Sequence, residues 1–158
     1  MTSQVPARAE LLHATAVIVG DRGVLITGPS GAGKSSIARA LVDRANARGS
    51  FAALVSDDQC QLRALSGRLV CEAPTSLQAG LEVRGSGLHA VDHEAAAIIH
   101  LAVELVGAAS AIRFAGDDRV QLQGVAIQRL RLPEREVEAA CRAIEARLFD
   151  PPWKKFLS

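Results

Sequence analysis

Short apolar runs alternate with polar turns along most of the chain, and this pattern predicts an α/β fold. Two β-rich runs, residues 15–19 (TAVIV) and 24–27 (VLIT), are separated by the tetrapeptide GDRG, whose composition favours a tight turn. They predict a hairpin. Further on, apolar positions recur at helical spacing up to residue 45, and Gly49 then supplies a stop signal. The pattern therefore predicts a hairpin followed by a loop and a helix.

The rest of the chain continues with strands and ends in a helix. Further strands are predicted at residues 51–55, 61–65, 68–72, 98–106 and, as one or two strands, 120–132. Residues 81–91 are predicted as a short strand that runs into a glycine-rich bend. Pro133 is expected to open the last helix at its first turn, with Glu134 and Glu136 near the positive end of the helix dipole and Phe149 near its end. We expect an α/β domain whose mixed sheet is flanked by helices.

Length and composition narrow the classes of protein. With 158 residues, of which 49% are hydrophobic, the chain is predicted to form a single domain over residues 1–158. A net charge of +1, four Phe, one Trp and no Tyr argue against a nucleic-acid partner. The N-terminus lacks the apolar core of a signal peptide, and His100 and Glu104 interrupt the most apolar stretch. We expect no membrane association and a cytoplasmic location.

Cysteine and histidine spacing does not predict a metal site. The three cysteines are far apart in sequence and odd in number, which fits reduced, buried thiols in a cytosolic protein: Cys60, Cys71 and Cys141. The later histidines have no regular ligand spacing: His89, His93 and His100. His100 lies in an apolar strand, so we expect a hydrogen-bonded core histidine there.

The stretch GPSGAGKS carries the clearest chemical signal. It matches Gly-x-x-x-x-Gly-Lys-Ser between a predicted strand and a predicted helix, the context in which this motif cradles nucleotide phosphates. The predicted nucleotide-binding residues are Gly28, Pro29, Ser30, Gly31, Ala32, Gly33, Lys34 and Ser35. Lys34 is expected to reach the β and γ phosphates, and the Ser35 hydroxyl to ligate Mg²⁺. The alternative is an ordinary glycine-rich turn before a helix.

Acidic residues lie just after one predicted strand and within another. The strand at 51–55 leads to Asp57 and Asp58, one of which would bind Mg²⁺ while the other accepts a proton from an attacking hydroxyl. Glu82 and Arg84 lie two apart on a predicted strand and would face the same side, pairing a metal ligand with a phosphate-binding group. The alternatives are two solvated acids in a turn and a surface ion pair.

Several segments in the same order resemble the catalytic domain of HPr kinase/phosphorylase. These are LHATAVIVGDRG, GVLITGPSGAGKSS, LVSDDQCQL and AGLEVRGSGL, which fall within roughly residues 11–91. The resemblance implies the P-loop fold of that family, which is similar to phosphoenolpyruvate carboxykinase. The chain looks like a short form that holds only the catalytic domain, without the N-terminal domain that members commonly carry.

The resemblance also implies roles for single residues. Asp57 matches the base that acts on a serine hydroxyl of the phosphocarrier protein HPr, and Lys34 and His13 match further active-site positions. Ser35 and Glu82 match the Mg²⁺ ligands, and we also assign Asp58 to the metal. Arg113 is our candidate for an arginine on a mobile loop, with a solvated loop arginine as the alternative.

The implied activity is ATP- and Mg²⁺-dependent phosphorylation of a serine on HPr or a closely related carrier. In the family's second reaction, inorganic phosphate attacks the phosphoserine to give pyrophosphate and free serine. The family forms hexamers, so we expect a homo-oligomer. Two competing hypotheses are a P-loop kinase for another protein or a small molecule, and a nucleotide-binding regulatory module without turnover.

Overall fold

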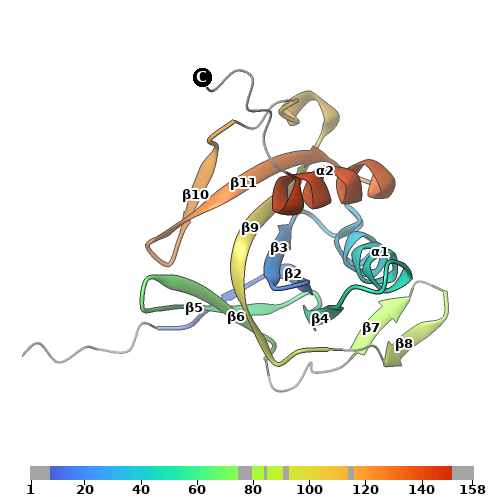
Figure 1. Cartoon of the computed structure of the whole chain (residues 1–158), viewed down its shortest axis with the longest axis horizontal. Coiled ribbons are helices and arrows are strands. Elements are labelled where there is room, and N and C mark those ends of the chain that lie inside the picture. Colours follow the sequence, from blue (N-terminus) through green and yellow to red (C-terminus); the bar gives the residue numbers. More distant parts are fainter. Residues whose placement is uncertain (1–7, 75–79, 84, 91–92, 114–115, 151–158) are drawn as a thin grey trace, which may run out of the picture.

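The computed structural model describes residues 8–74, 80–83, 85–90, 93–113 and 116–150. Among these residues the strands form a nine-stranded mixed sheet and a separate two-stranded sheet. The path through the larger sheet is β1-β5-β6-β9-β3-β2-β4, and β11 pairs with β9 and carries β10 at its other edge. Figure 1 shows the sheet as strongly curled.

The strands before residue 73 form the first part of the larger sheet. They are β1 (Glu10–Leu12), β2 (Ala14–Val19), β3 (Arg22–Thr27), β4 (Ala52–Ser56), β5 (Cys60–Leu65) and β6 (Arg68–Glu72). The later strands are β7 (Gly80–Val83), β8 (Gly87–Ala90), β9 (Ala96–Val106), β10 (Arg119–Leu122) and β11 (Val125–Pro133). The helices are α1 (Lys34–Ala47), the short 3₁₀ helix η2 (Ala108–Ser110) and α2 (Val137–Phe149).

The long strand β9 organises the sheet. Its first part pairs antiparallel with β6, and its later part lies parallel to both β3 and β11. The register shifts where Gly23 and Val24 meet Ile99 and Leu101. A Cβ atom on Gly23 would lie 2.2 Å from the Ile98 carbonyl oxygen, so this close approach requires glycine.

Each face of the larger sheet has its own hydrophobic core. On one face α1 and α2 pack against β2, β3, β9 and β11 through a core that includes Val17, Ile26, Leu41, Leu101 and Ile144. On the other face the curled sheet packs against itself, with a core that includes Ala16, Leu25, Leu62, Leu69 and Ile127. Both helices therefore lie on the same side of the sheet (Figure 1).

Most predicted elements are confirmed. The structure contains the hairpin β2–β3, the helix after the phosphate loop, the hairpin β5–β6 and the buried strand β9. The stretch at 120–132 forms two strands, β10 and β11, joined by a turn in which Gln123 and Gly124 have positive φ. Two short strands, β1 and β8, were not predicted, because each is stabilised by pairing with a partner strand rather than by its own pattern.

The predicted start of the last helix is wrong. Pro133 is the last residue of β11 and pairs in register with Val106, whereas α2 begins at Val137. The Glu134 backbone N–H donates to the Val106 carbonyl at 2.9 Å, and Arg135 has a positive φ of 61°. A helix cannot start before this left-handed residue, so the chain turns at residues 134–136 before it becomes helical.

The cysteine prediction is confirmed, while the histidine prediction is only partly right. Cys60, Cys71 and Cys141 are buried free thiols. His100 is hydrogen-bonded, since its Nδ1 accepts the Gly23 backbone N–H at 3.2 Å, but its side chain is exposed rather than in the core. No helix among the described residues is long and apolar enough to cross a membrane.

Candidate active site

The phosphate loop occupies the connection from β3 to α1. Gly31 and Gly33 have φ values of 82° and 107°, a region that side-chain-bearing residues rarely adopt. A Cβ atom on Gly28 would lie 3.0 Å from the Leu105 Cβ, which places the start of the loop against β9. Helix α1 begins directly after Gly33, so its first backbone N–H groups and its positive dipole end face the loop.

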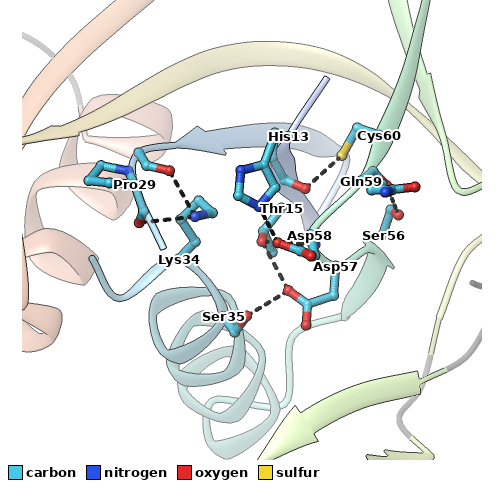
Figure 2. Close-up of polar contacts among 12 residues, drawn as sticks. His13, Thr15, Pro29, Lys34, Ser35, Ser56, Asp57, Asp58, Gln59 and Cys60 are labelled. Atoms are coloured by element: carbon cyan, nitrogen blue, oxygen red, sulfur yellow. Dashed lines mark hydrogen bonds and ion pairs between the residues drawn. The ribbon is translucent and has the colours of Figure 1, made fainter. Parts of the chain in front are cut away.

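Lys34 is buried in the loop, with 6% of the residue exposed. Its Nζ donates to the Gly28 carbonyl at 2.8 Å and to the Pro29 carbonyl at 3.2 Å (Figure 2). The ammonium group thus folds back over the loop. Bound phosphates would offer it stronger, charged acceptors in place of these carbonyls.

The segment before α2 contacts the phosphate loop through its backbone. The Arg135 backbone N–H donates to the Ala32 carbonyl at 2.8 Å, and Arg135 backbone atoms lie 3.8 Å from where a Cβ atom on Gly33 would be. This hydrogen bond ties the Ala32 carbonyl to the segment before α2, while the Ala32 backbone N–H donates to the Pro29 carbonyl at 3.1 Å within the loop. The side chain of Arg135 is 73% exposed, and its Nη2 lies 3.6 Å from Glu134 Oε2.

The carboxylate of Asp57 lies beside the first turn of α1. Its Oδ1 accepts the Ser35 hydroxyl at 2.6 Å and the Thr15 hydroxyl at 2.9 Å. Figure 2 shows both hydroxyls reaching this one oxygen, from α1 and from β2. Asp57 is thereby held next to the residue that is predicted to bind Mg²⁺.

Asp58 points instead toward His13, whose Nε2 pairs with Asp58 Oδ1 (Figure 2). The two side chains are half exposed and two-thirds exposed, respectively. Neighbouring acids in the sequence therefore have different partners: hydroxyl groups for Asp57 and an imidazole for Asp58. Ser35 is joined to Asp57 in the described contacts, while the assignment of Asp58 to the metal stays a prediction.

Both acids lie in one tight turn after β4. The Ser56 hydroxyl donates to the Gln59 carbonyl and closes the turn, and Asp58 has a φ of 70° within it. Aspartate tolerates this left-handed conformation better than most residues. The register between β2 and β4 also shifts between Ala16 and Val17, which indicates a bulge just before the turn. The bulge and the turn together direct Asp57 back over β2.

Cys60 lies directly after this turn and is buried. A hydrogen bond with the Cys71 thiol, together with burial, raises the pKa of the Cys60 thiol far above its ordinary value. Cys60 also donates to the Ala14 carbonyl at 3.3 Å. This environment disfavours the thiolate form that a nucleophilic cysteine needs.

Two further predicted site residues lie on other elements of the described chain. The Glu82 backbone lies in β7, in the separate two-stranded sheet, and its side chain is not described. Arg113 is exposed and lies in the connection between η2 and β10. Arg84 lies outside the described residues. The roles of Glu82 and Arg113 therefore stay predictions.

Two functional candidates were missed in the sequence. Thr15 is fully buried among apolar residues of β2, and a lone polar residue at a buried strand position requires a hydrogen-bond partner, which is a usable signal. Arg135 had no such signal, because its contact with the loop is made by the backbone. Neither contact is visible from spacing along the chain.

The donors near Ser35 fit a magnesium ion. Mg²⁺ prefers oxygen ligands and is usually bound by one or two protein groups together with water and substrate phosphates. The Ser35 hydroxyl and the Asp57 carboxylate are such oxygen donors at the N-terminus of α1. No group of three or more His, Cys, Asp or Glu side chains within the described part of the chain is placed to hold a metal without a substrate.

Fold and site together define an α/β domain with a phosphate loop and an acidic pair opposite it. The family model of the HPr serine kinase C-terminal domain matches residues 4–149, which is most of the chain. The chain belongs to this family.

Curated relatives match over a shorter segment. The chain is 39% identical over 77 residues to an HPr kinase/phosphorylase of Clostridium beijerinckii, a segment that covers 49% of this chain and 24% of the relative. It is 42% identical over 77 residues to the protein of the same name from Caldicellulosiruptor bescii, covering 48% and 23%. The matched segment thus spans about a quarter of these relatives' length.

A solved structure supports the fold. The chain is similar to the Hpr(Ser) kinase/phosphatase from Coxiella burnetii, with a TM-score of 0.72, 22% identity and coverage of 88% of each chain. The predicted fold class, a mixed α/β sheet with flanking helices, is confirmed by this likeness.

Proposed function

We propose that this domain transfers the terminal phosphoryl group of ATP to a serine of HPr or a closely related phosphocarrier protein. Membership of the HPr serine kinase C-terminal domain family supports the proposal, as do the relatives that bear the name HPr kinase/phosphorylase. The observation that carries it is the contact between the Asp57 carboxylate and Ser35, directly after the phosphate-loop lysine.

Asp57 is the proposed general base. A carboxylate beside the phosphate loop is placed to accept the proton of a serine hydroxyl as its oxygen attacks the γ-phosphorus. Its Oδ1 is held by two hydroxyls, and no hydrogen bond to Oδ2 is present among the described residues. Oδ2 is the atom that we assign to the proton.

The phosphate loop would stabilise the charge of the transferring group. Lys34 and the backbone N–H groups at the start of α1 are the proposed donors to the β and γ phosphates, and preorganised donors of this kind require little rearrangement during the reaction. A Mg²⁺ ion bound with the nucleotide would neutralise phosphate charge, with Ser35 as its proposed ligand and Glu82 and Asp58 as further candidates.

His13 is proposed as a second active-site residue. Its pairing with Asp58 holds the imidazole beside the acidic turn, with half of its side chain open to an approaching protein. A histidine in this position can orient the substrate serine or a phosphate oxygen.

Phosphorolysis is the proposed second activity. When inorganic phosphate attacks phosphoserine, the bond from phosphorus to the serine oxygen breaks and a new bond forms to give pyrophosphate. The leaving serine oxygen then needs a proton, and the same Asp57 carboxyl group can return it. One residue thus serves both directions.

The decisive experiment incubates the purified chain with Mg²⁺, ATP and HPr from the same source, followed by mass spectrometry of HPr. We expect one added phosphoryl group on a serine, and its loss when inorganic phosphate replaces ATP. An HPr with that serine replaced by alanine is the matched control. Absence of transfer to HPr, with transfer to another acceptor, would overturn the proposal.

A further inference from the structure

We propose that Thr15 is a positioning residue that keeps Asp57 oriented as the base once nucleotide and metal are bound. This inference rests on the proposed function, because it assigns Thr15 a part in the same proton transfer. It deepens that function by naming a residue that touches neither substrate nor cofactor.

The contact between Thr15 and Asp57 is built into the sheet. Thr15 lies in β2, opposite Ile26 of β3, and none of its surface is exposed. Its hydroxyl donates to Asp57 Oδ1 at 2.9 Å and makes a longer contact, 3.4 Å, with the Asp58 backbone N–H. A buried hydroxyl that bonds a carboxylate across 42 residues of sequence connects the strand to the acidic turn.

Asp57 Oδ1 accepts from two hydroxyls, and their surroundings differ. Ser35 is the predicted metal ligand at the start of α1, and its lone pairs can bind Mg²⁺ while its O–H still donates to Asp57. Thr15 is fully buried in β2, so its hydroxyl holds Oδ1 from the sheet and takes no part in metal binding. Thr15 therefore orients Asp57 from the side opposite the nucleotide and the metal.

Threonine suits this task for two reasons. Its branched Cβ restricts χ1, so the hydroxyl direction is fixed by the strand. Holding Oδ1 also leaves Oδ2 directed away from β2, where it can meet the serine hydroxyl (Figure 2). A small rotation of a catalytic carboxylate costs rate without affecting nucleotide binding.

The first test replaces Thr15 by valine, which keeps the shape and removes the hydroxyl. Hydrogen bonds to charged groups contribute enough that we expect kcat for transfer to HPr to fall about 10- to 100-fold. The Kd for MgATP should stay within about twofold, because the phosphate loop is untouched. Thr15→Ser should restore most of the rate, and Thr27→Val, whose hydroxyl faces the Val103 carbonyl, is the matched control.

A double variant distinguishes positioning from general damage. In an Asp57→Asn background, Thr15→Val should cause no further loss, because its effect passes through Asp57. An unchanged kcat in Thr15→Val would overturn the proposal. So would equal losses in Thr15→Ser and Thr15→Val, or an additive loss in the double variant.

A spectroscopic readout separates this inference from the proposed function. The ¹³C chemical shift of the Asp57 carboxyl group, assigned by its absence in Asp57→Asn, should change in Thr15→Val and return in Thr15→Ser, with MgADP bound. If the wild-type chain fails to phosphorylate HPr, the proposed function fails, and this measurement still decides whether Thr15 holds Asp57. An Asp57 signal that is unaffected by Thr15→Val overturns the inference.

Discussion

The carboxylates of Asp57 and Glu145 contact opposite ends of helix α1. Asp57, which follows β4, accepts from the first turn of α1, and Glu145, in α2, accepts from its last turn. Their hydrogen-bond partners differ in charge. Glu145 accepts from Arg44 at 2.6 and 2.9 Å and from Arg48 at 2.7 Å, and only 15% of its side chain is exposed. Asp57 accepts from two neutral hydroxyls. No Lys or Arg ion pair with Asp57 occurs within the described part of the chain.

This difference distinguishes a carboxylate in a charged network from the proposed general base. Burial acts to raise the pKa of Glu145, but the hydrogen bonds from Arg44 and Arg48 outweigh it and lower that pKa. A carboxylate neutralised by two guanidinium groups has little remaining affinity for a metal or a proton. The hydroxyl partners of Asp57 orient its carboxylate and carry no positive charge.

The largest expected effect is on rate. Asp57→Asn should lower transfer to HPr about 10²- to 10⁴-fold, because it removes the proton acceptor. The Asn side-chain oxygen can still accept from Ser35 and Thr15, so the melting temperature and the Kd for MgATP should change little. Steady-state kinetics, thermal melts and titration calorimetry measure the three quantities. Near-normal transfer would show that Asp57 is not the base.

In contrast to Asp57→Asn, Glu145→Gln should lower the stability of the fold and leave the rate of transfer almost unchanged. It leaves Arg44 and Arg48 without their shared anion between α1 and α2, so we expect about 2–3 kcal/mol lower free energy of unfolding in urea. The rate should stay near that of the wild type. Glu138→Gln is the matched control, because Glu138 is 72% exposed and pairs with Arg44 but not with Arg48 among the described residues. A large loss of rate in Glu145→Gln would contradict the proposed difference in role between Asp57 and Glu145.

The lowered pKa of Glu145 also predicts part of the acid sensitivity. Its stabilisation is fully present above the ordinary pKa of 4.5 and is lost as the pH falls through the lowered value. Urea unfolding of the wild type and Glu145→Gln between pH 7 and 3 should therefore converge toward the acid end. Curves that stay parallel would exclude this ion network as a source of acid sensitivity.

Substitutions at Arg135 test whether the phosphate-loop end of α1 depends on backbone contacts. Proline removes the N–H that donates to Ala32 and cannot adopt a φ of 61°, so Arg135→Pro should weaken MgATP binding and stability by about 1–2 kcal/mol. Arg135→Gly keeps both features, and we expect binding near that of the wild type. If glycine weakens binding as much as proline, the guanidinium group rather than the backbone is responsible.

The smallest expected effect is the pH dependence of stability that comes from His100. Its Nδ1 accepts a hydrogen bond from a neutral donor, the Gly23 backbone N–H. Burial first, and the nearby Arg22 second, lower its pKa. A lowered histidine pKa stabilises the fold above the ordinary value of 6.5, and this contribution is lost as the pH falls through the lowered value. Because the side chain is exposed, the melting temperature should drop only slightly between pH 7.5 and 5. His100→Asn should remove that part of the drop.

Much of the fold was predictable because its signals are local. The β2–β3 hairpin, the phosphate loop and α1 follow from apolar spacing and from Gly-x-x-x-x-Gly-Lys-Ser within 34 residues. The start of α2 was not predictable, since β11 is extended to Pro133 by parallel pairing with β9. A proline and nearby acids are also typical of a helix N-terminus, so the same residues favoured the wrong boundary.

The candidate site also has parts that the sequence predicts and parts that depend on the tertiary structure. The sequence by itself determined the phosphate loop and the acidic pair, because the motif and the strand before Asp57 are contiguous. Only the tertiary structure decided that Ser35 and Thr15 meet Asp57 while His13 meets Asp58. Those contacts depend on the register of β2 with β4, on its shift between Ala16 and Val17, and on the left-handed φ of Asp58. A shift of one residue in that register would turn Thr15 to the other face of the sheet.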